Sequence, residues 1–170
     1  YSFAELEPEL VACGVDGTVL VQSADSVEET RWMQAVADAH PRVAAIVAWV
    51  PLTAADDAAR LLDDYAADRR IVGIRHLIHN EPDEDWLLRD DVQEGLALLA
   101  ERDLTFDVVA VTDRHLRHVA SIAAAHPTLR IVIDHLAKPP IASGELMPWA
   151  DSLARAAARP NVYAKISGLN

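Results

Sequence analysis

The residues of this sequence best suited to chemistry stand at the end of one short apolar run. Ile131-Val132-Ile133 leads directly into Asp134-His135, and Lys138-Pro139-Pro140 follows at once. The β-branched residues predict a buried strand, which the prolines end. Active sites of parallel α/β proteins lie at the carboxyl ends of strands, so this imidazole is a candidate proton acceptor or hydrogen-bond donor. A structural histidine is the alternative, and the neighbouring elements must decide between them.

Similar runs recur at a spacing of about 30 residues, the size of a strand–helix unit. We expect strands at residues 17–22, 43–50, 71–78, 104–109, 130–135 and 161–167. Amphipathic stretches predict helices at residues 3–13, 23–39, 53–67, 85–102, 112–126 and 146–159. Strands that alternate with helices pair in parallel. The fold class is therefore α/β, either a doubly wound open sheet or most of a (β/α)8 TIM barrel.

Two observations separate these architectures. No glycine-rich phosphate loop follows a strand, since Gly14-Val15-Asp16-Gly17 precedes one, which disfavours a nucleotide-binding Rossmann domain. A full barrel takes about 250 residues. With 170 residues, this chain would be two units short of one.

Composition limits the classes of partner. The net charge of −12 argues against nucleic acid and against anionic membrane surfaces. No apolar stretch reaches the roughly 18 residues of a membrane span. Cys13 is the single cysteine, which excludes an internal disulfide and suits a reducing cytoplasm. The first residues are acidic, unlike a signal peptide, and include no initiating Met, so we expect the chain to begin within a larger protein.

Strand parity predicts which side chains face a barrel axis, because successive side chains point to opposite faces. Placing Val132 toward the helices turns His135 inward and Asp134 outward, where we expect it to be structural. The same reasoning turns Thr18 and Leu20 inward. The inward residues at the carboxyl ends of the strands are Gln22, Trp49, Arg75, Asp107, His135 and Lys165 or Ser167. Because unpaired buried charges are costly, this set is either a mutually paired network or a site.

The remaining histidines are weaker candidates. His40 and His126 each end an expected helix before a proline, where a polar residue satisfies free carbonyl groups. His115 and His118 are three apart on an expected helix, which could suit a metal but is better explained by a solvated helix face. His79 leads into a loop at the site edge and is a candidate substrate contact. The sequence has no Cys pair, no His-x-His and no Gly-x-Ser-x-Gly motif.

Four segments, distributed along essentially the whole chain, match residue patterns known from one protein family. They are Gly14-Val15-Asp16-Gly17-Thr18-Val19-Leu20-Val21-Gln22, Gly73-Ile74-Arg75-His76, Ile133-Asp134-His135-Leu136-Ala137-Lys138-Pro139 and Lys165-Ile166-Ser167-Gly168-Leu169. They resemble the amidohydrolase-2 family, within it the sugar-lactonase, fuconolactonase-like branch. The resemblance implies a (β/α)8 barrel that hydrolyses lactones or related carbonyl compounds. Residues 1–170 would then be a single, partial catalytic barrel domain containing its second to seventh strands.

The same resemblance informs the cofactor. The family pattern begins with His-x-His on the first strand and carries a functional Asp after the eighth, and neither occurs here, so we expect the chain alone to be inactive. His135 matches a sixth-strand histidine that takes part in catalysis in related enzymes. Metal-dependent relatives often have a histidine ligand where this sequence has Asp107. We expect no required cofactor, with a single divalent zinc ion as the alternative.

The leading functional hypothesis is a hydrolase that opens a sugar (aldono) lactone by adding water to its carbonyl. Arg75 would polarise or orient the carbonyl, and neutral His135 would position or deprotonate water or help to hold the oxyanion. Candidate contacts to the sugar ring and its hydroxyls are Gln22, Trp49, His79, Asp107, Lys138 and Lys165.

Two alternatives stay open. One is a metal-dependent amidohydrolase or decarboxylase of the same superfamily. The other is a non-catalytic barrel used for assembly, in which the polar set is a structural network. In the leading hypothesis the partner is a small lactone in the cytoplasm, without nucleic acid or membrane, and homo-oligomerisation is left open.

Overall fold

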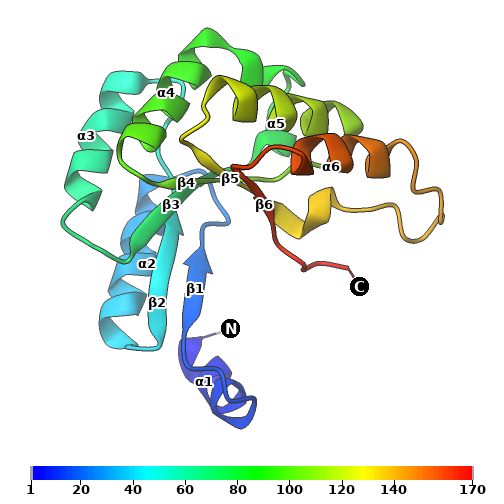
Figure 1. Ribbon diagram of the computed structural model, residues 1–170. Helices are drawn as coiled ribbons and strands as arrows, with labels where there is room; N and C mark the ends of the chain where they lie inside the picture. Colours follow the sequence, from blue (N-terminus) through cyan, green and yellow to red (C-terminus); the bar gives the residue numbers. More distant parts are fainter. Residues whose placement is uncertain (1, 170) are drawn as a thin grey trace.

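Six parallel strands form one sheet in the computed structural model, which describes residues 2–169 (Figure 1). The strands are β1 (Thr18–Val21), β2 (Val43–Ala48), β3 (Ile71–His76), β4 (Thr105–Val108), β5 (Arg130–Ile133) and β6 (Val162–Ala164). Each strand pairs with the next one along the chain, in the order β1-β2-β3-β4-β5-β6. All six predicted strands are confirmed, each somewhat shorter than the sequence pattern indicates.

Helices precede and connect the strands. They are α1 (Phe3–Ala12), α2 (Val27–Ala39), α3 (Ala55–Tyr65), α4 (Asp90–Glu101), α5 (Asp113–Ala125) and α6 (Trp149–Ala157), with short 3-10 turns η1 (Ile78–Asn80), η2 (Trp86–Leu88) and η3 (Asp134–Ala137). Figure 1 shows α2 to α6 along the outside of the curved sheet, with α1 at the amino end of β1. Within residues 2–169, none of these helices combines the length and apolarity that crossing a bilayer requires.

Local side chains explain where two of the helices begin. The Ser26 hydroxyl accepts a hydrogen bond from the Glu29 amide at 3.1 Å, and the Thr112 hydroxyl accepts one from the His115 amide at 3.1 Å. Each bond satisfies an amide that the first helical turn leaves free. The caps fix where α2 and α5 start and therefore the lengths of the loops before them.

The hydrophobic core lies between the sheet and the helices. From the strands, the core takes Ile74, Phe106, Val108, Ile131 and Ile133, all at 0% exposure. From α4 and α5 it takes Leu96, Leu99, Leu116, Val119 and Ile122, each at most 1% exposed. Burying one such side chain contributes about 1.5–3 kcal/mol. The aliphatic helix-facing layer holds the strands that carry the site.

Strand register confirms part of the predicted parity. Arg75 of β3 pairs with Asp107 of β4, so both side chains are on the face opposite the core. Lys165 follows β6 and its ammonium reaches Asp107, so it is on that face too. These three residues lie on the inner face, as predicted.

The parity predicted for β5 is wrong. Asp107 pairs with Val132, so Val132 is on the inner face and the two isoleucines beside it face the helices. Asp134, two residues after Val132, therefore turns inward, where it meets Arg75 and Lys165. The residues Ile131, Val132 and Ile133 put apolar side chains on both faces, so these three residues offer no contrast from which parity could be assigned.

The inward assignment of Leu20 in β1 is also wrong. Val21 pairs with Val47, and the register shifts between Thr18 and Val19. Leu20 consequently packs against the core, while Val19 is 53% exposed on the other face. An irregular pairing reverses the alternation, which a strict two-residue period does not anticipate.

Gly95 of α4 permits a close approach to the loop after β2. A Cβ atom there would overlap the Leu52 carbonyl oxygen and lie 2.9 Å from Leu52 Cα. Gly95→Ala should lower the free energy of unfolding by about 1–3 kcal/mol through overpacking, despite a gain in helix propensity. Urea unfolding measures this, with the exposed Glu94→Ala as control. Unchanged or increased stability of Gly95→Ala would contradict the close approach.

Candidate active site

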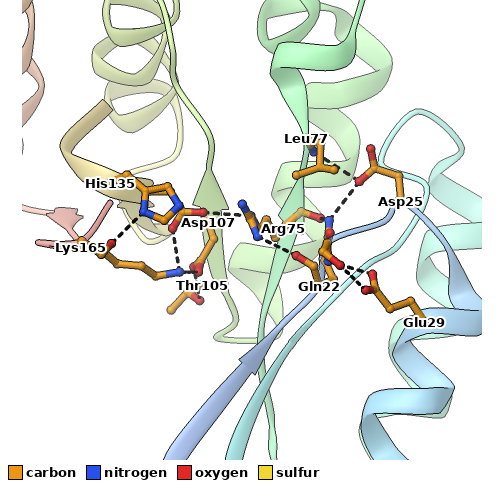
Figure 2. A network of polar contacts seen from close by, with 12 residues as sticks. Gln22, Asp25, Glu29, Arg75, Leu77, Thr105, Asp107, His135 and Lys165 are labelled. Carbon is orange, nitrogen blue, oxygen red and sulfur yellow. Dashed lines mark hydrogen bonds and ion pairs between the residues drawn. The ribbon is translucent and has the colours of Figure 1, made fainter. Parts of the chain in front are cut away.

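Arg75, Asp107, Asp134 and Lys165 form a network of charged side chains at the carboxyl end of the sheet. Figure 2 labels Arg75, Asp107 and Lys165 of this network. Lys165 Nζ lies 2.5 Å from Asp107 Oδ2 and 2.7 Å from Asp134 Oδ1. Arg75 Nε lies 2.9 Å from Asp134 Oδ2, an ion pair in which the N–H is not aligned for a hydrogen bond. The Asp107 and Asp134 side chains are 3% and 2% exposed, and that of Lys165 is 32% exposed. The network joins β3, β4, β5 and β6.

Burial and pairing set the protonation of this network. Burial raises the pKa of the Asp107 carboxyl, and the hydrogen bond from Lys165 offsets only part of that effect. Burial lowers the pKa of the Lys165 ammonium, but its contacts with Asp107 and Asp134 outweigh this and place the pKa above the ordinary value. Lys165 is therefore a fixed cation near neutral pH.

Gln22 ties β1 to β3. Arg75 Nη1 donates to the Gln22 carbonyl oxygen at 2.6 Å, and Gln22 Nε2 donates to the Arg75 carbonyl oxygen at 2.9 Å and to Asp25 Oδ1 at 3.0 Å. Gln22 is 0% exposed, and its Oε1 atom has no hydrogen-bond partner among residues 2–169. A buried amide oxygen without a donor is costly, so it is an acceptor that a ligand hydroxyl could satisfy. These contacts fix the guanidinium beside Asp134.

His135 lies in a left-handed turn that begins as β5 ends. His135, Leu136, Ala137 and Lys138 have φ angles of 52°, 49°, 57° and 49°. Non-glycine residues at such angles cost about 1–3 kcal/mol each, so surrounding contacts must hold the turn. The Leu136 amide donates to the Lys165 carbonyl oxygen at 3.1 Å, and the Leu136 carbonyl accepts from Trp149 Nε1 at 2.8 Å. The turn thus rests on β6 and α6.

The turn changes what His135 contacts. Its Nδ1 atom lies 2.9 Å from Ser167 Oγ, whereas Asp134 takes the contacts with Arg75 and Lys165 that parity had assigned to His135. The strand ends at Ile133, so alternation no longer applies at position 135. The contact with Ser167 uses Nδ1 and leaves Nε2 available for proton transfer.

A second cluster of polar side chains surrounds His76. This histidine was not selected as a site residue in the sequence analysis. Trp49 Nε1 donates to His76 Nδ1 at 3.3 Å, and His76 Nε2 is 2.7 Å from Glu81 Oε1. The ring stacks on Trp86 with centroids 4.2 Å apart. A cavity of about 350 Å³ is lined by these four residues with Asp25, Pro51, Leu52, Thr53 and Arg89. The signals for His76 in the sequence were its position at the end of a strand, after Arg75, and its place in the segment Gly73-Ile74-Arg75-His76.

Two of the predicted contacts lie on exposed loops. Both His79 in η1 and Lys138 after η3 are exposed. Burial, followed by the positive charges of Lys138 and Arg75, lowers the pKa of the His79 imidazole. His79 is therefore neutral at physiological pH and lies near cationic groups at the edge of the network.

The interpretation of His115 and His118 as a solvated helix face is wrong. Both are buried, at 6% and 8% exposure. His118 Nε2 lies 3.1 Å from Asp85 Oδ1, and His115 Nδ1 accepts a hydrogen bond from the Val111 amide at 3.3 Å. Burial lowers the pKa of both imidazoles. They attach α5 to neighbouring loops.

The residues that the structure describes do not fit a divalent metal ion. Within residues 2–169, no three His, Cys, Asp or Glu side chains gather in a way that could hold one. The two inner carboxylates, Asp107 and Asp134, are already bridged by the Lys165 ammonium. We therefore derive no catalytic step through a metal.

Comparisons with known sequences identify the family. A model of the amidohydrolase family matches residues 1–170. The chain is 42% identical over 165 residues to the L-fucono-1,5-lactonase of Burkholderia ambifaria, covering 97% of this chain and 56% of that protein. It is 32% identical over 170 residues to the L-fucono-1,5-lactonase of Burkholderia multivorans, covering 96% and 56%. The chain belongs to the amidohydrolase family and spans 56% of the length of these two relatives.

A solved structure confirms the fold. The crystal structure of an amidohydrolase from Burkholderia multivorans with bound zinc superposes with a TM-score of 0.87 at 30% sequence identity. The match covers 99% of this chain and 60% of that chain. The six strand–helix units are therefore part of a TIM barrel, as predicted.

Gly168 provides a test of how His135 is positioned. Its φ is +61°, and a Cβ atom there would lie 2.9 Å from His135 Nδ1. Gly168→Ala should displace the imidazole from Ser167 and lower stability by about 1–3 kcal/mol.

Gly144→Ala is a matched control, because Gly144 has φ +70° but no atom lies within 4 Å of the place that its Cβ atom would take. Thermal unfolding and the imidazole resonances of His135 in NMR spectra measure the two effects. Equal losses of stability and an unmoved His135 resonance would show that the imidazole is not held at this position.

Proposed function

We propose that the protein opens a sugar lactone by adding water to its carbonyl group, and that residues 1–170 are part of a single catalytic barrel domain. The observation that carries the proposal is the buried network of Arg75, Asp107, Asp134 and Lys165, which presents fixed cations at the carboxyl end of the sheet. Two relatives, at 42% and 32% identity, are named L-fucono-1,5-lactonases, so an aldono-1,5-lactone is the substrate class we propose.

The chemistry requires a proton acceptor for water and donors for the oxygen that becomes negative. We assign the first role to His135 through Nε2, with Nδ1 held by Ser167 at 2.9 Å. Histidine is the side chain that most often acts as a general acid or base in enzymes. Arg75 is the proposed orienting cation, since Asp134 and the Gln22 carbonyl fix its guanidinium.

The other proposed substrate contacts surround these groups. The Oε1 atom of Gln22 offers a buried acceptor, and the Trp49 indole is held by His76. His79 and Lys138 are exposed at the edge of the network, where they can contact sugar hydroxyls. Asp107 and Lys165 form its inner side. We propose these six residues as the binding site for the ring.

The proposal extends to the protein's surroundings. The single cysteine, Cys13, is exposed, so we propose a cytoplasmic enzyme without internal disulfides. The partner is the small lactone itself. A homo-oligomer stays a prediction.

His135→Asn tests the proposed proton transfer. Asn fills similar space and retains a hydrogen-bonding group near Ser167, but it cannot take a proton from water. Turnover of L-fucono-1,5-lactone by the protein in its full natural length should fall about 10²–10⁴-fold. His40→Asn, at the amino end of β2, is the matched control. Unchanged turnover in His135→Asn would refute the role of the imidazole.

A metal-dependent amidohydrolase is the second candidate, because the related crystal structure from B. multivorans contains zinc. We propose that lactone opening requires no metal, since Lys165 already bridges Asp107 and Asp134. Dialysis against a chelator should leave turnover within about twofold, and elemental analysis should find far less than one equivalent of zinc. Loss of activity that zinc restores would favour the second candidate.

A further inference from the structure

The Lys165 ammonium is held by two carboxylates that come from different strands. Asp107 is in β4 and Asp134 directly follows β5, while Lys165 directly follows β6. Its Nζ atom lies 2.5 Å from one carboxylate and 2.7 Å from the other. Because the two carboxylates are almost fully buried and cannot leave, they fix the position of the ammonium more firmly than a surface ion pair would.

The Lys165 ammonium has N–H groups that are free to bind a ligand. A lysine ammonium carries three N–H groups. One donates to Asp107 Oδ2, and the contact with Asp134 Oδ1 is an ion pair at 2.7 Å without hydrogen-bond alignment. The Lys165 side chain is 32% exposed, whereas the two carboxylates are 3% and 2% exposed. The Lys165 side chain is therefore partly accessible to a ligand at this end of the sheet, whereas the two carboxylates are not.

The four side chains of the network carry no net charge. Asp107 and Asp134 are balanced by Lys165 and Arg75, so the buried acids are neutralised and do not repel an incoming oxygen. Of the two cations, Arg75 already uses Nε toward Asp134 and Nη1 toward the Gln22 carbonyl. Lys165 is the more exposed of the two, with 32% against 14% for Arg75.

We infer that Lys165 is a catalytic residue that donates a free N–H to the carbonyl oxygen of the lactone as that oxygen becomes negative. The inference rests on the proposed lactonase function. The ammonium supplies, from a side chain, the fixed positive charge that a metal ion supplies in metal-dependent hydrolases. Asp134 is a positioning residue, because it acts through Lys165, and Asp107 positions Lys165 in addition to its proposed contact with the ring.

The reaction balances without a further reactant. Water oxygen forms a bond to the carbonyl carbon, its proton passes to His135, and the carbonyl electron pair moves to the oxygen that Lys165 faces. The carbonyl then re-forms, the bond from carbon to the ring oxygen breaks, and the proton on His135 passes to that ring oxygen. The product is the open hydroxy acid, which releases its proton to solvent at neutral pH. Lys165 stays protonated throughout.

The test compares three variants of the protein in its full natural length. Lys165→Met should lower kcat for L-fucono-1,5-lactone about 10²–10³-fold, the loss typical of removing one oxyanion donor. KM should change less than about threefold, because the bond forms mainly in the transition state. Arg155→Met, which removes an exposed positive charge from α6, is the control and should retain turnover.

The double variant Lys165→Met/Asp107→Asn separates catalysis from folding. It removes the charge that Lys165→Met leaves unpaired and keeps the Arg75–Asp134 pair. It should unfold at a temperature close to the wild type and remain as inactive as the single variant. Recovered turnover in the double variant would mean that Lys165 only balances charge, which overturns the inference.

The outcomes distinguish this inference from the proposed function. A wild-type protein that is active while Lys165→Met keeps its kcat overturns the role of Lys165 and leaves lactone hydrolysis standing. A wild-type protein that opens no lactone in a panel of aldono-1,5- and aldono-1,4-lactones overturns both.

Discussion

The Asp134 carboxylate is the constraint on which the arrangement of the site depends. It is 2% exposed and contacts two cations from two other strands, Arg75 at 2.9 Å and Lys165 at 2.7 Å. Removing one partner from a buried ion pair typically costs about 3–5 kcal/mol, because a charge is left without compensation. The carboxylate therefore requires both cations at this end of the sheet, and each cation is held where chemistry can use it. The same cationic groups therefore stabilise the buried carboxylate and are placed to act on a substrate.

The rest of the site is organised outward from this contact. Arg75 connects it to β1 through the reciprocal hydrogen bonds with Gln22, and Lys165 connects it to β4 through Asp107. The helix-facing side chains Ile74, Phe106, Val108, Ile131 and Ile133 of β3, β4 and β5 are apolar and 0% exposed, so these strands cannot readily rotate to relax the network. A closely packed layer on one face thus supports a polar layer on the other, which is how barrel enzymes hold a site rigidly while their loops vary.

The sequence predicted the architecture better than the site. The repeated alternation of apolar runs with amphipathic stretches depends on many residues, so all six strands and their parallel pairing were predictable. The orientation of Asp134 depends on a single choice of parity, and Ile131-Val132-Ile133 is apolar on both faces. The contact between His135 and Ser167 follows from a left-handed turn of four non-glycine residues, which local propensity disfavours. Tertiary contacts decided both of these features.

The left-handed turn after β5 also has a mechanical consequence. Its Leu136 peptide is bonded on one side to the backbone of Lys165 and on the other to the indole of Trp149, the first residue of α6. The turn is too constrained to absorb a displacement by changing its own dihedral angles, since neighbouring regions of conformational space are forbidden to its residues. A shift of the start of α6 therefore moves the turn as a rigid unit, and the turn then displaces the end of β6, next to Lys165.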